Sequence, residues 1–183
     1  MSSLADYKKT EIVNGVVYNM SPANLRHIAI QRNLSIIIGS FLKGKRCKLF
    51  TEAGVTLDEN NFFIPDLVVV CDPAKITYSG IKGAPDFVVE VLSLSTKRKD
   101  ISEKKAAYEK FGVREYWIID PKAESIEAYI LREGRFELDG VYHNVHEEEM
   151  EHLDEEEKAE IHVSLKISLY DDLVLYTKDI FEF

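Results

Sequence analysis

The sequence predicts an α/β (α+β) fold, in which helices flank a mixed central sheet in the order α-β-β-β-α-β and extra β-hairpins are added. Three observations predict it. Residues 22–42 follow a helical apolar period, three stretches rich in β-branched and aromatic residues lie between residues 47 and 93, and a strand, a helix and a strand succeed one another over residues 85–120. Because such a succession forms a parallel crossover, the sheet is expected to be mixed.

The N-terminal half supplies a hairpin, a helix and three strands. Residues 11–20 predict a hairpin around a type I′ turn at Asn14-Gly15. Ser21 is the expected N-cap of a helix that begins at Pro22 and ends near Leu42. The three apolar stretches predict strands in a partly antiparallel meander, within residues 47–57, 62–71 and 85–93.

The C-terminal half begins with a second helix, expected from about Ile101 to Phe111 and closed by Gly112. Residues 115–120 (EYWIID) predict the next strand, and residues 125–143 predict a further hairpin. The parallel crossover therefore joins the strand within residues 85–93 to the strand at 115–120.

Composition is ordinary for one globular domain over residues 1–183, with 45% hydrophobic and 30% charged residues. No apolar stretch approaches the roughly 20 residues of a membrane span, and the N-terminus has no signal-peptide core, so we expect a cytoplasmic protein without membrane contact. Cys47 and Cys71 lie in apolar, strand-like surroundings, which predicts reduced buried thiols rather than a disulfide or a zinc site.

The charge is unevenly distributed. Residues 147–160 hold nine acids and one lysine, so this segment carries −8 of the formal net charge of −9 and predicts an exposed, charged excursion. The rest of the chain is nearly neutral. Its basic residues cluster twice, and each cluster fits a nucleic-acid surface or ordinary solvated charge equally well: Lys43, Lys45, Arg46 and Lys48, and then Lys97, Arg98 and Lys99.

Two acids lie within apolar stretches, Asp66 in IPDLVVV and Glu90 in DFVVEVL. A buried carboxylate is costly unless it is paired, protonated or bound to a metal ion, so two of them on neighbouring strands indicate a divalent-cation site. The helical period points Lys104 into the buried stripe of the second helix and places Lys105 at its edge. We therefore expect Asp66, Glu90 and Lys104 to converge.

Other polar residues follow the same faces. Asp100 and Tyr108 flank Lys104 at i−4 and i+4 on one line of the second helix. His27 and Gln31 begin a face of the first helix that becomes apolar further along, so His27 either borders the site or is a satisfied boundary residue.

A purely structural reading is also open. In it, Lys104 neutralises Glu90 in a buried ion pair and Asp66 caps a turn near Pro65. Asp86 follows Pro85 in the same local pattern as Asp66, and we expect it to be structural.

These residues resemble the PD-(D/E)xK nuclease superfamily, whose first motif is similar to Pro65-Asp66 and whose second is similar to Glu90. The lysine usual two residues after the second acid is here Leu92. This departure resembles the Uma-type family of predicted restriction endonucleases, in which a strand ending EVLSxST precedes a DxxxKxxxY helix and a GVxEYWIxDP strand. The chain reads EVLSLST, then Asp100, Lys104 and Tyr108, then GVREYWIIDP.

The resemblance extends from Glu11 to near Asp171 and implies a restriction endonuclease-like core, with an acidic insertion at about residues 143–162. It implies a Mg²⁺-dependent endonuclease, with Mn²⁺ as a substitute, that hydrolyses DNA phosphodiester bonds. Asp66, Glu90 and the carbonyl of Val91 would then ligate the metal, and Lys104 would orient the attacking water or offset phosphate charge. The candidate accessory residues are Glu11, His27, Glu52, Asp100 and Tyr108.

The leading hypothesis is that such an enzyme acts as a homodimer, so that two sites address two DNA strands. The alternative is a catalytically inactive nucleic-acid-binding or protein-interaction module on the same fold, with the acidic segment facing a protein partner. Metal binding through Asp66 and Glu90 would distinguish the two hypotheses.

Overall fold

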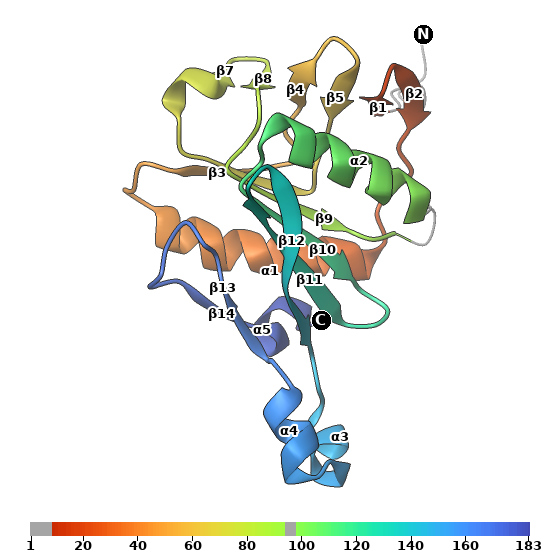
Figure 1. Cartoon of the computed structure of the whole chain (residues 1–183), viewed down its shortest axis with the longest axis vertical. Helices are drawn as coiled ribbons and strands as arrows, with labels where there is room; N and C mark the ends of the chain where they lie inside the picture. Colours follow the sequence, from red (N-terminus) through yellow and green to blue (C-terminus); the bar gives the residue numbers. More distant parts are fainter. Residues whose placement is uncertain (1–8, 94–97) are drawn as a thin grey trace, which may run out of the picture.

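The computed structural model describes residues 9–93 and 98–183, which form three layers (Figure 1). The middle layer is a six-stranded sheet of order β12-β11-β10-β9-β6-β3. Helix α1 (Leu25–Leu42) and the C-terminal elements cover one face of this sheet. Helix α2 (Arg98–Phe111) and a second six-stranded sheet, of order β2-β1-β5-β4-β8-β7, cover the other face.

The central sheet contains β3 (Lys48–Thr51), β6 (Leu67–Val70), β9 (Phe87–Val91), β10 (Glu115–Asp120), β11 (Ser125–Arg132) and β12 (Arg135–His143). The second sheet contains β1 (Thr10–Val13), β2 (Val16–Asn19), β4 (Val55–Asp58), β5 (Asn61–Phe63), β7 (Ile76–Thr77) and β8 (Gly80–Lys82), with the 3₁₀ turn η2 (Pro73–Lys75) before β7. The remaining elements are α3 (Glu147–His152), α4 (Glu155–Glu160), β13 (Ser164–Lys166), β14 (Val174–Tyr176) and α5 (Thr177–Phe181).

The predicted mixed sheet is confirmed. Strands β3, β6 and β9 form an antiparallel meander, and β9 and β10 are parallel partners joined through α2. The hairpin turn at Asn14-Gly15 has φ values of 50° and 81°, as a type I′ turn requires. Helix α2 ends at Phe111, and Gly112 follows with φ 84°.

The predicted start of the first helix is wrong by three residues. Helix α1 begins at Leu25, and its N-cap is Asn24, whose Oδ1 accepts a hydrogen bond from the backbone N of His27 at 3.0 Å. Asn and Ser cap helices about equally well, so the sequence alone did not separate Asn24 from Ser21.

Two of the predicted strands are each divided between the two sheets. The stretch 47–57 becomes β3 and β4, because the chain turns at Glu52, which has a φ of 49°. At Gly54 the backbone passes so close to Phe62 that a Cβ would lie 2.8 Å from its ring. The stretch 62–71 becomes β5 and β6 on either side of Pro65, which has no N–H for a ladder.

The prediction of reduced thiols is also wrong, because Cys47 and Cys71 form a disulfide. Lys48 lies opposite Val70 in the β3–β6 pair, and continuing this register by one residue places the two cysteines opposite each other. The apolar surroundings were read correctly, but the strand register that makes the cysteines partners was not visible in the sequence.

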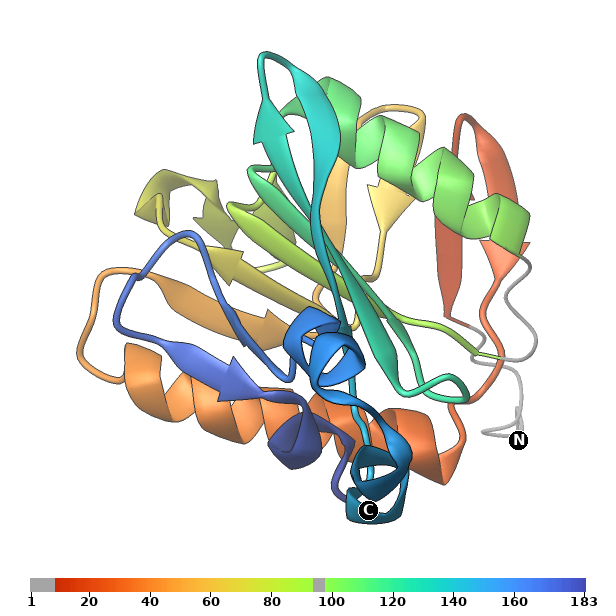
Figure 2. The same cartoon turned by 60° about the horizontal axis from the view of Figure 1, so that its bottom comes forward.

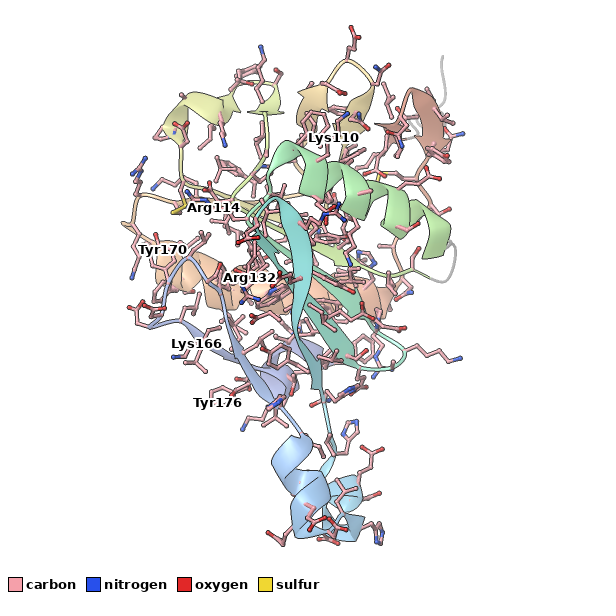
Figure 3. The ribbon with its side chains drawn as sticks, in the orientation of Figure 1. Lys110, Arg114, Arg132, Lys166, Tyr170 and Tyr176 are labelled. Atoms are coloured by element: carbon pink, nitrogen blue, oxygen red, sulfur yellow. A yellow bond between two sulfur atoms is a disulfide. The ribbon has the colours of Figure 1, made fainter. Side chains whose placement is uncertain are left out.

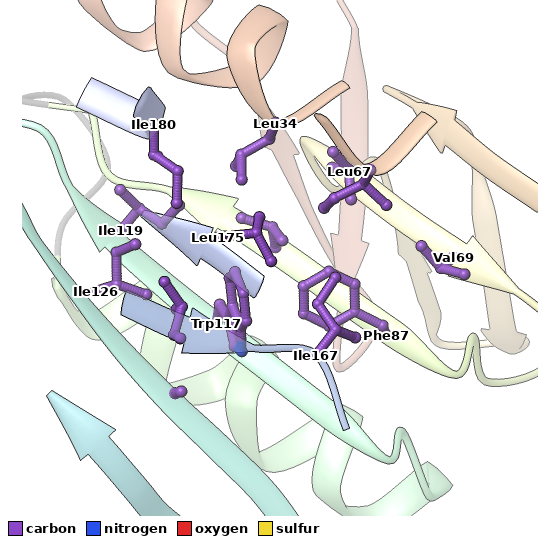
Figure 4. Close-up of a cluster of buried hydrophobic side chains, with 14 of the residues drawn as sticks. Leu34, Leu67, Val69, Phe87, Trp117, Ile119, Ile126, Ile167, Leu175 and Ile180 are labelled. Atoms are coloured by element: carbon purple, nitrogen blue, oxygen red, sulfur yellow. The ribbon is translucent and has the colours of Figure 1, made fainter. Parts of the chain in front are cut away.

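A large apolar cluster lies between the central sheet and α1, and the C-terminal segment completes it (Figure 4). Leu165, Ile167, Leu175 and Ile180 are all 3% exposed or less. By contrast, the acidic excursion (residues 147–160) forms α3 and α4, which project below the layers in Figure 1 and come forward, in front of them, in Figure 2. None of the described helices is long and apolar enough to cross a membrane.

Candidate functional site

Asp66 and Glu90 face each other across the antiparallel strands β6 and β9. Leu67 pairs with Val89, and continuing the register by one residue places Asp66 opposite Glu90 on the same face of the sheet. Pro65 ends the preceding ladder, so Asp66 stands at the beginning of β6. The backbone therefore brings together the two acids singled out in the sequence.

Helix α2 adds the predicted lysine. Lys104 is 6% exposed, and its Nζ lies 2.5 Å from Glu90 Oε1. One turn further on, the hydroxyl of Tyr108 donates to the same Glu90 oxygen at 2.9 Å. Lys105 lies at the edge of the helix, with its Nζ 3.2 Å from the centre of the Tyr129 ring. The predicted orientation of both lysines is confirmed.

Helix α1 supplies two polar contacts to Asp66. His27 Nε2 lies 2.7 Å from Asp66 Oδ1, and Gln31 Nε2 donates to the backbone oxygen of Asp66 at 2.8 Å. The other carboxylate oxygen, Oδ2, accepts from the backbone N of Val91 at 2.7 Å. His27 thus borders the site. Gln31 also contacts Asp66; the sequence placed it on the same polar helix face as His27, but it was not predicted to be a site residue.

Glu11 is a third acid in the same cluster. It reaches the cluster from β1, and its Oε1 accepts from Lys104 Nζ at 2.9 Å and from the backbone N of Ile64 at 2.7 Å. Only 8% of Glu11 is exposed. The carboxylates of Glu11 and Glu90 therefore share one buried ammonium group, and Asp66 lies opposite Glu90 in the same cluster.

The electrostatics follow from this crowding. Burial raises the pKa of Glu90, and the neighbouring Glu11 and Asp66 raise it further, so that it reaches about 7 although Lys104 opposes the shift. Burial lowers the pKa of His27, but its hydrogen bond to Asp66 and the charge of Asp66 outweigh burial and raise the pKa above its ordinary value. Burial alone lowers the pKa of Lys104, and the charges of Glu90 and Glu11 raise it on balance.

The other candidates lie further out. The side chain of Glu52 is exposed and forms an ion pair with Lys9. Only its backbone N reaches the site, where it donates to the backbone oxygen of Asp66 at 3.3 Å. The side chain of Asp100 lies outside the described residues. Asp86 accepts from the backbone N of Cys71 at 2.8 Å, which is the structural role that the sequence predicted for it.

Two buried polar atoms have no hydrogen-bond partner among the described residues: His27 Nδ1 and the hydroxyl of Tyr116. Tyr116 lies on β10, and burial together with the charges of Glu90 and Asp66 raises its pKa well above the ordinary value. Sequence reasoning missed Tyr116, because its place in an apolar strand gives no signal that its hydroxyl lies within electrostatic reach of the acids.

The donor chemistry of the cluster fits a hard divalent cation. Carboxylate oxygens are the ligands that Mg²⁺ prefers, and the cluster holds three acids, two of which share one ammonium group. No ready-made group of three His, Cys, Asp or Glu ligands occurs within residues 9–93 and 98–183. Both Asp66 oxygens already accept hydrogen bonds, so a cation would have to replace at least one protein contact.

Comparisons with known proteins agree with this fold. The family pattern of Uma2, described as "Putative restriction endonuclease", matches residues 3–165. "Uncharacterized protein slr1290" from Synechocystis sp. is 27% identical over 125 residues, which span 67% of this chain and 66% of that protein. The crystal structure of a "putative nuclease belonging to DUF820" from Anabaena variabilis has a TM-score of 0.72 and 21% identity, over 94% of this chain and 89% of that one. The latter likeness establishes the restriction endonuclease-like fold.

Proposed function

Because the chain belongs to the Uma2 family, we propose that it is a Mg²⁺-dependent endonuclease that hydrolyses DNA phosphodiester bonds. The observation that carries the proposal is the buried cluster in which Asp66, Glu90 and Lys104 converge. Two acids on adjacent strands and one lysine on the helix packed against them are groups that metal-assisted phosphodiester hydrolysis uses.

In this proposal Asp66, Glu90 and the backbone carbonyl of Val91 hold the metal ion. When bound, the ion supplies a Lewis acid for the scissile phosphate and lowers the pKa of a coordinated water. Lys104 places a positive charge beside Glu90, where it offsets charge that develops on the phosphate. Tyr108 fixes Glu90 and His27 fixes Asp66, so both acids are held in position before substrate arrives.

The test combines calorimetry and cleavage. We expect Mn²⁺ and Mg²⁺ to bind the unmodified protein, and Asp66→Asn/Glu90→Gln to lose both the binding and metal-dependent cleavage of DNA. Asp86→Asn is the matched control, because Asp86 is a carboxylate at the opposite end of β9 from Glu90, and among the described residues its side chain contacts the backbone N of Cys71 and Arg114. Metal-dependent cleavage that persists in the double variant would refute the site.

A second function is favoured by one observation. The acids are already satisfied by protein donors, since Lys104 and Tyr108 contact Glu90 while His27 and Val91 contact Asp66. A metal-free network of this kind suits a module that binds nucleic acid without cutting it. That module would bind DNA equally well before and after Asp66→Asn/Glu90→Gln and would take up no metal.

The homodimer and the protein partner at the acidic excursion, both expected from the sequence, are also part of this proposal. A dimer would let two sites address two strands. Sedimentation of the protein with and without a DNA duplex tests it, and a monomer under both conditions would contradict it.

A further inference from the structure

Arg26 borders the candidate site and is held by an acid. It directly precedes His27 in the first turn of α1, and His27 contacts Asp66. Its guanidinium Nη2 is paired with Glu124 Oε1. The side chain of Arg26 is 45% exposed, whereas that of Glu124 is only 13% exposed. The arginine is therefore open to solvent while its partner is largely enclosed.

Glu124 is fixed from the other side by the base of the acidic excursion. Its Oε2 accepts from Asn144 Nδ2 at 2.5 Å and lies 3.2 Å from His146 Nε2. The backbone N of Asn144 donates to the backbone oxygen of Glu124 at 2.9 Å. Asn144 and His146 connect β12 to α3, so the turn between β10 and β11, the start of α1 and the base of the excursion meet at the Glu124 carboxylate.

The chemistry of the pair points to a competition. A guanidinium group binds carboxylate and phosphate through the same forked arrangement of N–H donors. We propose that Arg26 binds a backbone phosphate of DNA and that Glu124, held by Asn144 and His146, is the intramolecular competitor that occupies Arg26 in the free protein. The inference rests on the proposed function in that it takes DNA as the ligand.

The charge distribution supports the same direction of effect. The excursion that follows His146 carries −8 of the net charge of −9. A phosphate that approaches Arg26 must displace Glu124, and the negative charge of the excursion repels it as well. Both effects weaken DNA binding. The excursion thus restrains binding at the edge of the site through a defined contact as well as through its overall charge.

The experiment measures binding of a short fluorescein-labelled DNA duplex by anisotropy in EDTA, across a series of salt concentrations. Arg26→Gln should weaken binding by roughly 3- to 10-fold at low salt and reduce the salt slope by about 0.9, as expected for the loss of one phosphate contact. Glu124→Gln should tighten binding, because it keeps a hydrogen-bonding side chain but frees Arg26. Tightening should vanish in Arg26→Gln/Glu124→Gln.

Arg114→Gln is the matched control. Arg114 is also an exposed arginine near one acid, with its Nη1 3.7 Å from Asp86 Oδ1, but it lies at the opposite end of β10 from the turn that holds Glu124 (Figure 3). Its loss changes the net charge equally and should leave the salt slope unchanged. Circular dichroism spectra and unfolding midpoints verify that each variant is folded.

The outcomes separate this inference from the proposed function. Equal effects of Arg26→Gln and Arg114→Gln, or no tightening in Glu124→Gln, would overturn the inference even if the protein cleaves DNA. An Arg26-specific effect without metal-dependent cleavage would support the inference and refute the nuclease proposal. Failure of the unmodified protein and of Glu124→Gln to bind DNA at low salt would overturn the inference as well.

Discussion

Lys104 is the residue on which the buried cluster depends, because its ammonium group contacts both Glu90 and Glu11. Lys104→Met leaves these acids without their cation, and breaking a buried pair in this way costs about 3–5 kcal/mol. Lys105→Met removes a cation–π contact with the Tyr129 ring and the charge interactions with Glu127 and Glu109 on the partly exposed side of the helix, and should cost less than about 1 kcal/mol. Urea unfolding of both variants measures the difference.

A double variant tests whether the lost stability comes from the unpaired charge of Glu90. In Lys104→Met/Glu90→Gln the uncompensated charge of Glu90 is absent, so part of the lost stability should return. Equal destabilisation by Lys104→Met and Lys105→Met would contradict the assignment of Lys104 to the interior.

The raised pKa of Glu90 predicts the pH dependence of metal binding. Below its pKa of about 7 the carboxyl holds a proton, which a cation must displace, so affinity for Mn²⁺ should rise with pH up to about 7 and then level off. Calorimetry at pH 6 in two buffers of different ionisation enthalpy should show a buffer-dependent heat from proton release. A heat that is independent of the buffer would contradict metal binding at Glu90.

The sequence predicted the residues of the site unevenly. Lys104 was placed correctly, because helical periodicity is a local property that is read over a window of roughly 11–18 neighbouring residues. Glu11 was named only as an accessory candidate, since it lies 93 residues from Lys104 in the chain and no local pattern shows that β1 reaches α2. The hydroxyl of Tyr116 was missed for the same reason.

Among the elements, β3 is one of the two edge strands of the central sheet, and a disulfide between the residues that flank β3 and β6 holds it to β6. The bond closes a loop with a sequence separation of 24 residues, which corresponds to about 3.5 kcal/mol of stabilisation through the unfolded state. Reduction, or Cys47→Ser/Cys71→Ser, should lower the free energy of unfolding by about this amount. Thermal unfolding with and without reductant measures it, and the double variant should no longer respond to reductant.

The elements also show where strand prediction stops. The apolar stretches predicted where the strands of the central sheet lie, and β10 has the bounds that were predicted for it. They did not show that two of the stretches are each divided between the two sheets. That division depends on a left-handed residue at Glu52 and on the packing of Gly54 against Phe62. Such contacts are tertiary, so propensity and pattern do not reveal them.

At the scale of the whole molecule, the segments that bury apolar surface differ from the segment that carries most of the net negative charge. The order of helices and strands was predictable because short turns join β10, β11 and β12 and because a crossover between parallel strands has one favoured hand. The contribution of the C-terminal segment was not, because β13, β14 and α5 are short and show their role only through burial against α1 and the central sheet. The acidic excursion was recognised from composition alone.

This separation predicts that changes in the acidic excursion and in the C-terminal segment have unequal effects on stability. Replacing residues 147–160 by a short Gly-Ser linker removes charge but little buried apolar surface, so the free energy of unfolding should change by less than about 1 kcal/mol. Ile167→Ala and Leu175→Ala each remove a side chain that is 2% exposed or less, and should cost about 2–5 kcal/mol. Ser168, next to Ile167, also donates through its backbone N and its hydroxyl to the buried Glu115, which ties this segment to β10. Urea unfolding curves compare the three variants, and loss of cooperative unfolding in the linker variant would show that the excursion is part of the folding unit.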